Sequence, residues 1–245
     1  MAGSVAVAFA DSSIVVLALP DLYGAFNTSI VGVSWVITSY NLVVAIVAAV
    51  IAGLSQHLDV RRWAQIGLAL FTAASIGCAV SWTLAALIVF RCVQGLGAAF
   101  VLATSISLLG GLRGSREQGI ALWTSVAVLG AALGPVLGGV LTQLFDWRAI
   151  FVVQAPVAGV ALLATAAGAV TLPSEAHRRR GHGALAADTA LGLVFAALVG
   201  ALFLAVLLVI TVWGLEPIVG ALVVSALPVA TIAARPVGRG LTTVQ

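Results

Sequence analysis

The sequence predicts an all-α protein that crosses a membrane several times. Of its 245 residues, 62% are hydrophobic and only 8% are charged, and the mean hydropathy is +1.21. Soluble domains carry about 25% charged residues, so this chain could not cover a water-facing surface, and soluble and disordered classes are excluded. The apolar runs are long and continuous, without the two-residue alternation of a membrane barrel. We therefore expect a polytopic bundle of membrane helices.

Eight apolar runs are long enough to cross a bilayer as helices, which takes about 20 residues each. They lie at 4–23, 31–53, 64–82, 84–109, 119–143, 148–172, 189–212 and 217–234. The first run has no positive segment before it and contains an acid, Asp11, so it predicts a membrane helix rather than a cleaved signal peptide. The polar stretch 173–188 divides the chain into a six-helix unit (1–172) and a two-helix remainder (189–245).

The loop arginines predict the orientation of the bundle. All eleven basic residues are arginine, and the loops after even-numbered spans hold nine of the ten that lie outside spans: Arg61, Arg62, Arg113, Arg116, Arg178, Arg179, Arg180, Arg235 and Arg239. The opposite loops hold only Arg148. By the positive-inside rule, both termini are cytoplasmic in a plasma (inner) membrane, and the net charge of +3 serves topology rather than nucleic-acid binding. We expect four tryptophans at span ends to anchor the helices at the membrane interface: Trp63, Trp82, Trp147 and Trp213.

Two ionisable residues remain inside the spans, Asp11 in the first and Arg91 in the fourth. Each is costly at the bilayer centre unless it faces a cavity or a partner. Asp11 lies roughly 10–12 Å in from the cytoplasmic side and Arg91 about 10 Å in from the other side, so the two could interact near the midplane. The functional interpretation is a proton relay, with Gln94 on nearly the same helix face as a hydrogen-bonding group. The alternatives are an Asp11 that snorkels to the interface and a static ion pair or backbone contact for Arg91.

Glycines repeat every four residues in the fifth span. Gly130, Gly134 and Gly138 share one helix face, and Pro135 and Gly139 accompany them. This spacing makes a smooth groove that lets another backbone approach closely, and proline bends a helix. The pattern predicts a close helix–helix contact that changes during function.

The sequence shows no arrangement typical of an enzyme or a bound cofactor. The histidines, His57, His177 and His182, all lie in predicted loops without metal-ligand spacing. The segment 95–100 lacks the strand and spacing of a phosphate-binding loop, so ATP-driven transport is not supported. The two cysteines lie inside apolar runs and predict buried side chains.

Several motifs, taken in order, resemble the major facilitator superfamily and within it the drug:proton antiporter branch of multidrug exporters. The first is the acid segment that runs from Asp11 to Pro20. The others are Trp35 with Tyr40 in the second span, Arg91, Gln94, Gly95 and Gly97 in the fourth, the glycine–proline set of the fifth, and Trp147, Arg148, Phe151 and Pro156 in the sixth.

The resemblance implies two six-helix halves that alternate around a central cavity, without a cofactor. It implies proton-coupled export of small lipophilic or cationic drugs, with Asp11 and Arg91 in proton coupling and the glycine-rich fifth span in gating. The predicted partners are the lipid bilayer, the substrate and protons. The predicted substrate-cavity residues are Gln94, Tyr40 and Asn41, and those of the cytoplasmic loop motif are Gly53, His57, Arg61 and Arg62.

The chain departs from the family pattern in three ways. His57 stands where the loop motif has an acid, and Val60 where it has a glycine; Val16 replaces a position that is often polar. The family has twelve to fourteen helices and this chain supplies about eight, so we expect a fragment that needs complementing helices or an oligomer for transport. The alternative function is a non-transporting fragment or partner subunit that binds ligand or other helices. Uptake of a metabolite is disfavoured only by the antiporter-like fifth span.

Overall fold

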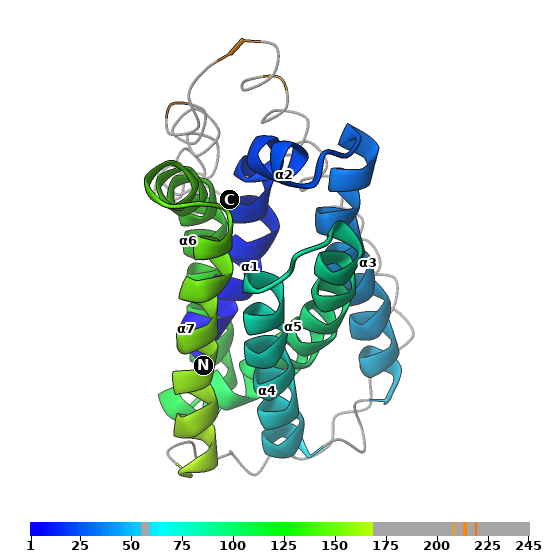
Figure 1. The fold of residues 1–245 in the computed structure, drawn as a ribbon. Coiled ribbons are helices and arrows are strands. Elements are labelled where there is room, and N and C mark those ends of the chain that lie inside the picture. Colours follow the sequence, from blue (N-terminus) through cyan, green and yellow to red (C-terminus); the bar gives the residue numbers. More distant parts are fainter. Residues whose placement is uncertain (55–58, 169–207, 209–212, 215–218, 220–245) are drawn as a thin grey trace, which may run out of the picture.

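The structure, a computed structural model, describes residues 1–54 and 59–168 and the single residues 208, 213, 214 and 219. The described part is all α-helical, and its helices run through the bundle in alternating directions (Figure 1). In chain order they are α1 (Ala2–Leu17), α2 (Leu19–Phe26), α3 (Ile30–Leu54), α4 (Val60–Ala79), α5 (Leu84–Arg113), α6 (Arg116–Leu144) and α7 (Arg148–Ala166). The predicted linker 173–188 and the last two predicted spans lie outside the described residues.

Four of the described helices are long and apolar enough to cross a membrane by length and composition: α3, α5, α6 and α7. The number rises to five if α1 and α2 together form one bent span. The third predicted span corresponds to α4, which is not among them and whose first turn carries Arg61 and Arg62.

The first predicted span, 4–23, is not one continuous helix. The chain breaks at Ala18, and α1 and α2 meet at an angle of 60°. Pro20 stands in the first turn of α2. Proline fits there because its missing N–H is not needed, whereas inside a continuous helix it removes a hydrogen bond and clashes with the preceding turn. The single-helix prediction was therefore wrong, since apolarity continues across a backbone break.

Polar side chains set the starts of three helices. The Asp59 carboxylate accepts from the Arg61 and Arg62 amides at 3.1 and 3.2 Å and begins α4. The Thr83 hydroxyl accepts from the Ala86 amide, and the Ser115 hydroxyl from the Gln118 amide, each at 3.2 Å. These N-caps satisfy amides that have no partner inside the helix, so α4 and α6 begin a few residues before the apolar runs that predicted them.

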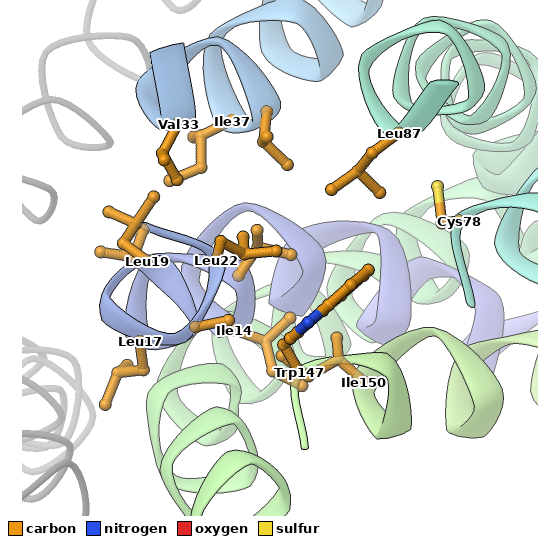
Figure 2. Packing of buried hydrophobic residues seen from close by; sticks show 14 of the residues in the cluster. Ile14, Leu17, Leu19, Leu22, Val33, Ile37, Cys78, Leu87, Trp147 and Ile150 are labelled. Atoms are coloured by element: carbon orange, nitrogen blue, oxygen red, sulfur yellow. The ribbon is translucent and has the colours of Figure 1, made fainter. Parts of the chain in front are cut away.

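The helices pack in an order that differs from their order in the sequence. α1 lies mainly against α6, α4 lies against both α5 and α7, and α3 lies against α5. An apolar core closes the end of the bundle near α2 (Figure 2). Its labelled members are Ile14, Leu17, Leu19, Leu22, Val33, Ile37, Cys78, Leu87, Trp147 and Ile150.

Trp147 lies inside this core, with only 3% of its surface exposed. Its ring lies 5.5 Å from that of Phe26 and 6.2 Å from that of Phe151, measured between centroids. Trp82, in contrast, is 86% exposed. The predicted interfacial role of Trp147 was therefore wrong, because the position of a residue at a helix end does not tell which way the side chain points.

Candidate functional site

Asp11 of α1 and Arg91 of α5 form a fully buried ion pair in the middle of the bundle. Both side chains are 0% exposed, and Arg91 Nη1 donates to Asp11 Oδ2 at 2.5 Å. Arg91 Nε also donates to the Val36 carbonyl of α3 at 2.9 Å. The proximity predicted from opposite ends of antiparallel helices is thus observed. A snorkelling Asp11 is ruled out, because its carboxylate points into the bundle.

Two glutamine amides complete a ring around this pair. Arg91 Nη1 donates to Gln94 Oε1 at 2.8 Å, Gln94 Nε2 donates to Gln154 Oε1 at 2.9 Å, and Gln154 Nε2 donates to Asp11 Oδ1 at 2.6 Å. Gln94 Nε2 also donates to Ser75 Oγ of α4 at 2.9 Å. Side chains from α1, α4, α5 and α7 therefore meet in one hydrogen-bonded network.

Aromatic rings cover the guanidinium. The Arg91 Cζ atom lies 4.2 Å from the centroid of the Tyr40 ring and 5.8 Å from that of Phe151. The Tyr40 hydroxyl donates to the Ala8 carbonyl at 3.1 Å and so ties α3 to α1. A cation over an aromatic face is stabilised most where water is excluded, as it is here.

The network offsets much of the cost of burying two charges. Burial of an ion pair is costly unless further hydrogen bonds satisfy the remaining donors and acceptors. Asp11 uses both carboxylate oxygens, and Arg91 uses Nε and Nη1. Arg91 Nη2 is buried and has no hydrogen-bond partner among the described atoms. The site thus holds one guanidinium nitrogen without a hydrogen-bond partner in the described part of the chain, beside the Asp11 carboxyl group and inside a region without water-facing surface.

The structure places the predicted substrate-cavity residues in different surroundings. Gln94 and Tyr40 are 0% and 1% exposed. Gln94 belongs to the hydrogen-bonded network, and the Tyr40 ring covers Arg91. Asn41 is half-buried one residue further along α3, and its Nδ2 donates to the Ile37 carbonyl at 3.1 Å. Contact of these three residues with a substrate stays a prediction.

Sequence reasoning missed Gln154 and Ser75. Gln154 is a polar residue inside the apolar run of α7, three positions after Phe151 and two before Pro156. That isolation in an apolar run was the available signal. Ser75 gave none, since serine hydroxyls in helices often bond only to their own backbone.

The glycine repeat of α6 lies along α1. A Cβ added at Gly138 would lie 2.5 Å from the Ile14 carbonyl oxygen, and one at Gly134 would lie 2.8 Å from the Ala10 carbonyl oxygen. A Cβ at Gly130 would collide with the Ala6 backbone. α6 continues through Pro135, and Pro135 and Gly139 are both buried. The close contact predicted for this motif is observed, and its partner is the helix that carries Asp11.

Part of the predicted loop motif joins α4 to α7. Arg61 Nε donates to the Thr165 carbonyl and Nη2 to the Ala166 carbonyl, each at 3.0 Å, so this arginine caps the C-terminal end of α7. The Arg62 side chain is exposed. Gly53 lies in the last turn of α3, and His57 lies outside the described residues.

Among the described residues, no group of histidine, cysteine and acidic side chains could hold a metal ion.

A sequence model of the Major Facilitator Superfamily matches residues 1–243. The chain belongs to this superfamily. It is therefore a multi-pass membrane protein of a transporter family and not an enzyme.

Curated superfamily members with similar sequences include drug efflux and resistance proteins. The chain is 38% identical to the multidrug resistance protein Stp of Mycobacterium tuberculosis over 64% of its own length, which is 30% of Stp. It is 34% identical to the drug efflux pump JefA of the same organism, over 65% of this chain and 32% of JefA. It is 32% identical to the methylenomycin A resistance protein of Bacillus subtilis, over 77% of this chain and 41% of that protein. The matched region thus spans about a third of each relative.

Solved superfamily structures share the fold. The crystal structure of a D-xylose–proton symporter gives a TM-score of 0.62 at 15% identity, covering 93% of this chain and 64% of that one. A bacterial homologue of the human lysosomal transporter Spinster, inward-facing and unoccupied, gives 0.59 at 15% identity, covering 74% of this chain and 44% of that one. These similarities establish the helical arrangement and nothing about the substrate.

Proposed function

We propose that this chain takes part in proton-coupled export of small lipophilic or cationic compounds, with Asp11 as the proton-binding group and Arg91 as its counter-charge. The observation that carries the proposal is the buried contact between these two side chains across α1 and α5. Ionisable groups at membrane depth are rare and usually mark ion or proton pathways. The efflux and resistance proteins among its relatives support the direction and the substrate class.

The chemistry follows from charge balance inside the bundle. An ionised Asp11 attracts Arg91, whereas a protonated Asp11 leaves the guanidinium without its counter-charge. Binding of a proton therefore weakens the contact between α1 and α5. Since Gly130, Gly134 and Gly138 hold α1 directly against α6, a shift of α1 is passed to α6. In this scheme the glycine–proline set acts as the gating element of alternating access.

The remaining expectations belong to the same proposal. The arginine-rich ends face the cytoplasm, the protein lies in the plasma membrane, and eight helices form a six-helix half (1–172), a linker (173–188) and part of a second half (189–245). Because about a third of each relative is matched, we propose that transport needs further helices, supplied by complementing segments or by a second copy. The bilayer, protons and a small lipophilic substrate are the other partners.

Substrate-dependent proton flux in everted membrane vesicles tests the proposal. The chain is expressed alone and together with the remainder of a relative, which supplies the further helices, and a panel of lipophilic cations is added while the pH gradient is followed. We expect the gradient to collapse with a substrate when the further helices are present, and the response to disappear in Asp11→Asn at unchanged expression. Asp146→Asn is the matched control, because that acid is 54% exposed and outside the network.

A response that survives in Asp11→Asn would contradict the coupling role. The alternative, a non-transporting partner subunit, is favoured by the short share of each relative that is matched. It predicts no proton flux that depends on Asp11, either from the wild-type chain alone or when the remainder of a relative is co-expressed.

A further inference from the structure

Arg91 determines which group donates and which accepts in each hydrogen bond of the ring of side chains around Asp11. A guanidinium can only donate hydrogen bonds, so the Gln94 oxygen must face Arg91 and the Gln94 nitrogen must face outward. Ser75 Oγ donates to the Phe71 carbonyl at 2.7 Å and therefore accepts from Gln94. The Gln154 oxygen must then face Gln94, which leaves the Gln154 nitrogen to donate to Asp11.

This arrangement favours an ionised carboxylate, because both hydrogen bonds to Asp11 come from donors. A proton in the lone-pair position on Oδ1 that faces Gln154 would meet an N–H donor, and one in the position on Oδ2 that faces Arg91 would meet the guanidinium. To accept a proton at either of these two positions, Asp11 must lose its hydrogen bond from Gln154 or from Arg91. Gln154 therefore stands on the side of the carboxylate that the arginine does not cover.

We infer that Gln154 is a positioning residue that stabilises the ionised form of Asp11 and aligns its carboxylate with Arg91. The inference rests on the proposed proton-binding role of Asp11. Gln154 is well placed for this task because it is 3% exposed, so its hydrogen bond to the carboxylate does not compete with water. The same hydrogen bond joins α7 to α1, so protonation of Asp11 would alter a contact of α7.

Other groups near the carboxylate come from three helices. Arg91 of α5 contacts Asp11 directly, and the Tyr40 ring of α3 covers Arg91 at 4.2 Å. Cys78 of α4 lies 3.8 Å from Gln94 Oε1, measured from its sulfur. On the α6 side, Asp11 belongs to the stretch of α1 that meets the glycine repeat, which carries no charge. A change confined to Gln154 therefore leaves the charges around Asp11 as they are.

The protonation of Asp11 can be followed without transport. In the full chain reconstituted in lipid, infrared spectroscopy records the stretching band of a protonated carboxyl, and the component missing from Asp11→Asn belongs to Asp11. We expect Gln154→Met to move the midpoint pH of this band upward by about one unit, because a donor to the charged form is lost while side-chain length is kept. Gln154→Glu places a second carboxyl within reach and moves the upper midpoint of the coupled pair above the wild-type midpoint, since two like charges oppose ionisation.

Thr165→Val is the matched control on α7. Thr165 is 1% exposed, and its hydroxyl donates to the Ala161 carbonyl, remote from the network. We expect the wild-type midpoint in this variant. A wild-type midpoint in Gln154→Met and Gln154→Glu would overturn the inference, and so would an equal shift in Thr165→Val. If Asp11→Asn left transport unchanged while Gln154→Met moved the band, the proposed function would fail and the positioning role would stand.

Discussion

At the scale of single residues, the site combines groups that depend on one another. Asp11 and Arg91 are tolerated inside the bundle because each satisfies the other and because Val36, Gln94 and Gln154 supply further hydrogen bonds. In such an arrangement, removal of one charge lowers the free energy of unfolding more than removal of both, because a single buried charge has no partner of opposite sign.

This dependence predicts the outcome of a double-mutant cycle. Arg91→Met in the wild-type background leaves Asp11 buried without a counter-charge, and we expect it to lower the free energy of unfolding by about 3–5 kcal/mol. In an Asp11→Asn background the same change should cost clearly less, because no charge is left behind. Unfolding of the purified chain in mixed detergent measures both steps. The contacts of Arg91 with Val36 and Gln94 are lost in both backgrounds, so equal costs would argue against the charge coupling.

At the scale of helices, glycine decides how closely α1 and α6 approach. Gly134 and Gly138 lie against carbonyl oxygens of α1, where no side chain fits without movement of a backbone. Gly24 on α2, in contrast, has no atom within 4 Å of an added Cβ. The same substitution therefore has opposite consequences on two helices of one chain.

We expect Gly138→Ala to lower the melting temperature and Gly24→Ala to leave it unchanged or raise it slightly. The added methyl group at Gly138 would lie 2.5 Å from the Ile14 oxygen, and overpacking of this kind typically costs about 1–3 kcal/mol. At Gly24 the change only favours the helix. Thermal unfolding in detergent, followed by tryptophan fluorescence, compares the two variants. Equal melting temperatures would mean that α1 and α6 can separate without cost.

At the scale of the whole molecule, the outward faces of the helices are apolar along most of their length. Exposed large side chains lie on α3 (Ile30, Val31, Trp35, Leu42, Ile46, Val50), α6 (Leu129, Leu133, Leu137, Leu144) and α7 (Val152, Val153, Val160, Leu163). Faces of this kind suit lipid or further helices. The turn between α5 and α6 lies at the opposite end of the bundle from the turn between α6 and α7, since α6 spans the distance between them (Figure 1).

The positive-inside rule predicts that these two ends lie on opposite sides of the membrane. In a background with Cys78→Ala and Cys92→Ala, we expect Asp146→Cys to react with an impermeant maleimide in intact cells. Glu117→Cys should react only in everted vesicles. Both side chains are exposed, so access to the reagent decides the result. The reverse pattern would place the arginine-rich ends outside.

The sequence by itself determined the class of protein, the approximate course of the helices that the structure describes, and the two ionisable residues inside them. These follow from local properties, because the length and apolarity of a segment decide whether it suits a bilayer. The tertiary structure alone decided the break at Ala18, the burial of Trp147 and the recruitment of Gln154. These depend on contacts between helices that are far apart in the chain. The partners of Gln154, a single polar residue in an apolar run, are defined only by the packing of α7 with the other helices of the network.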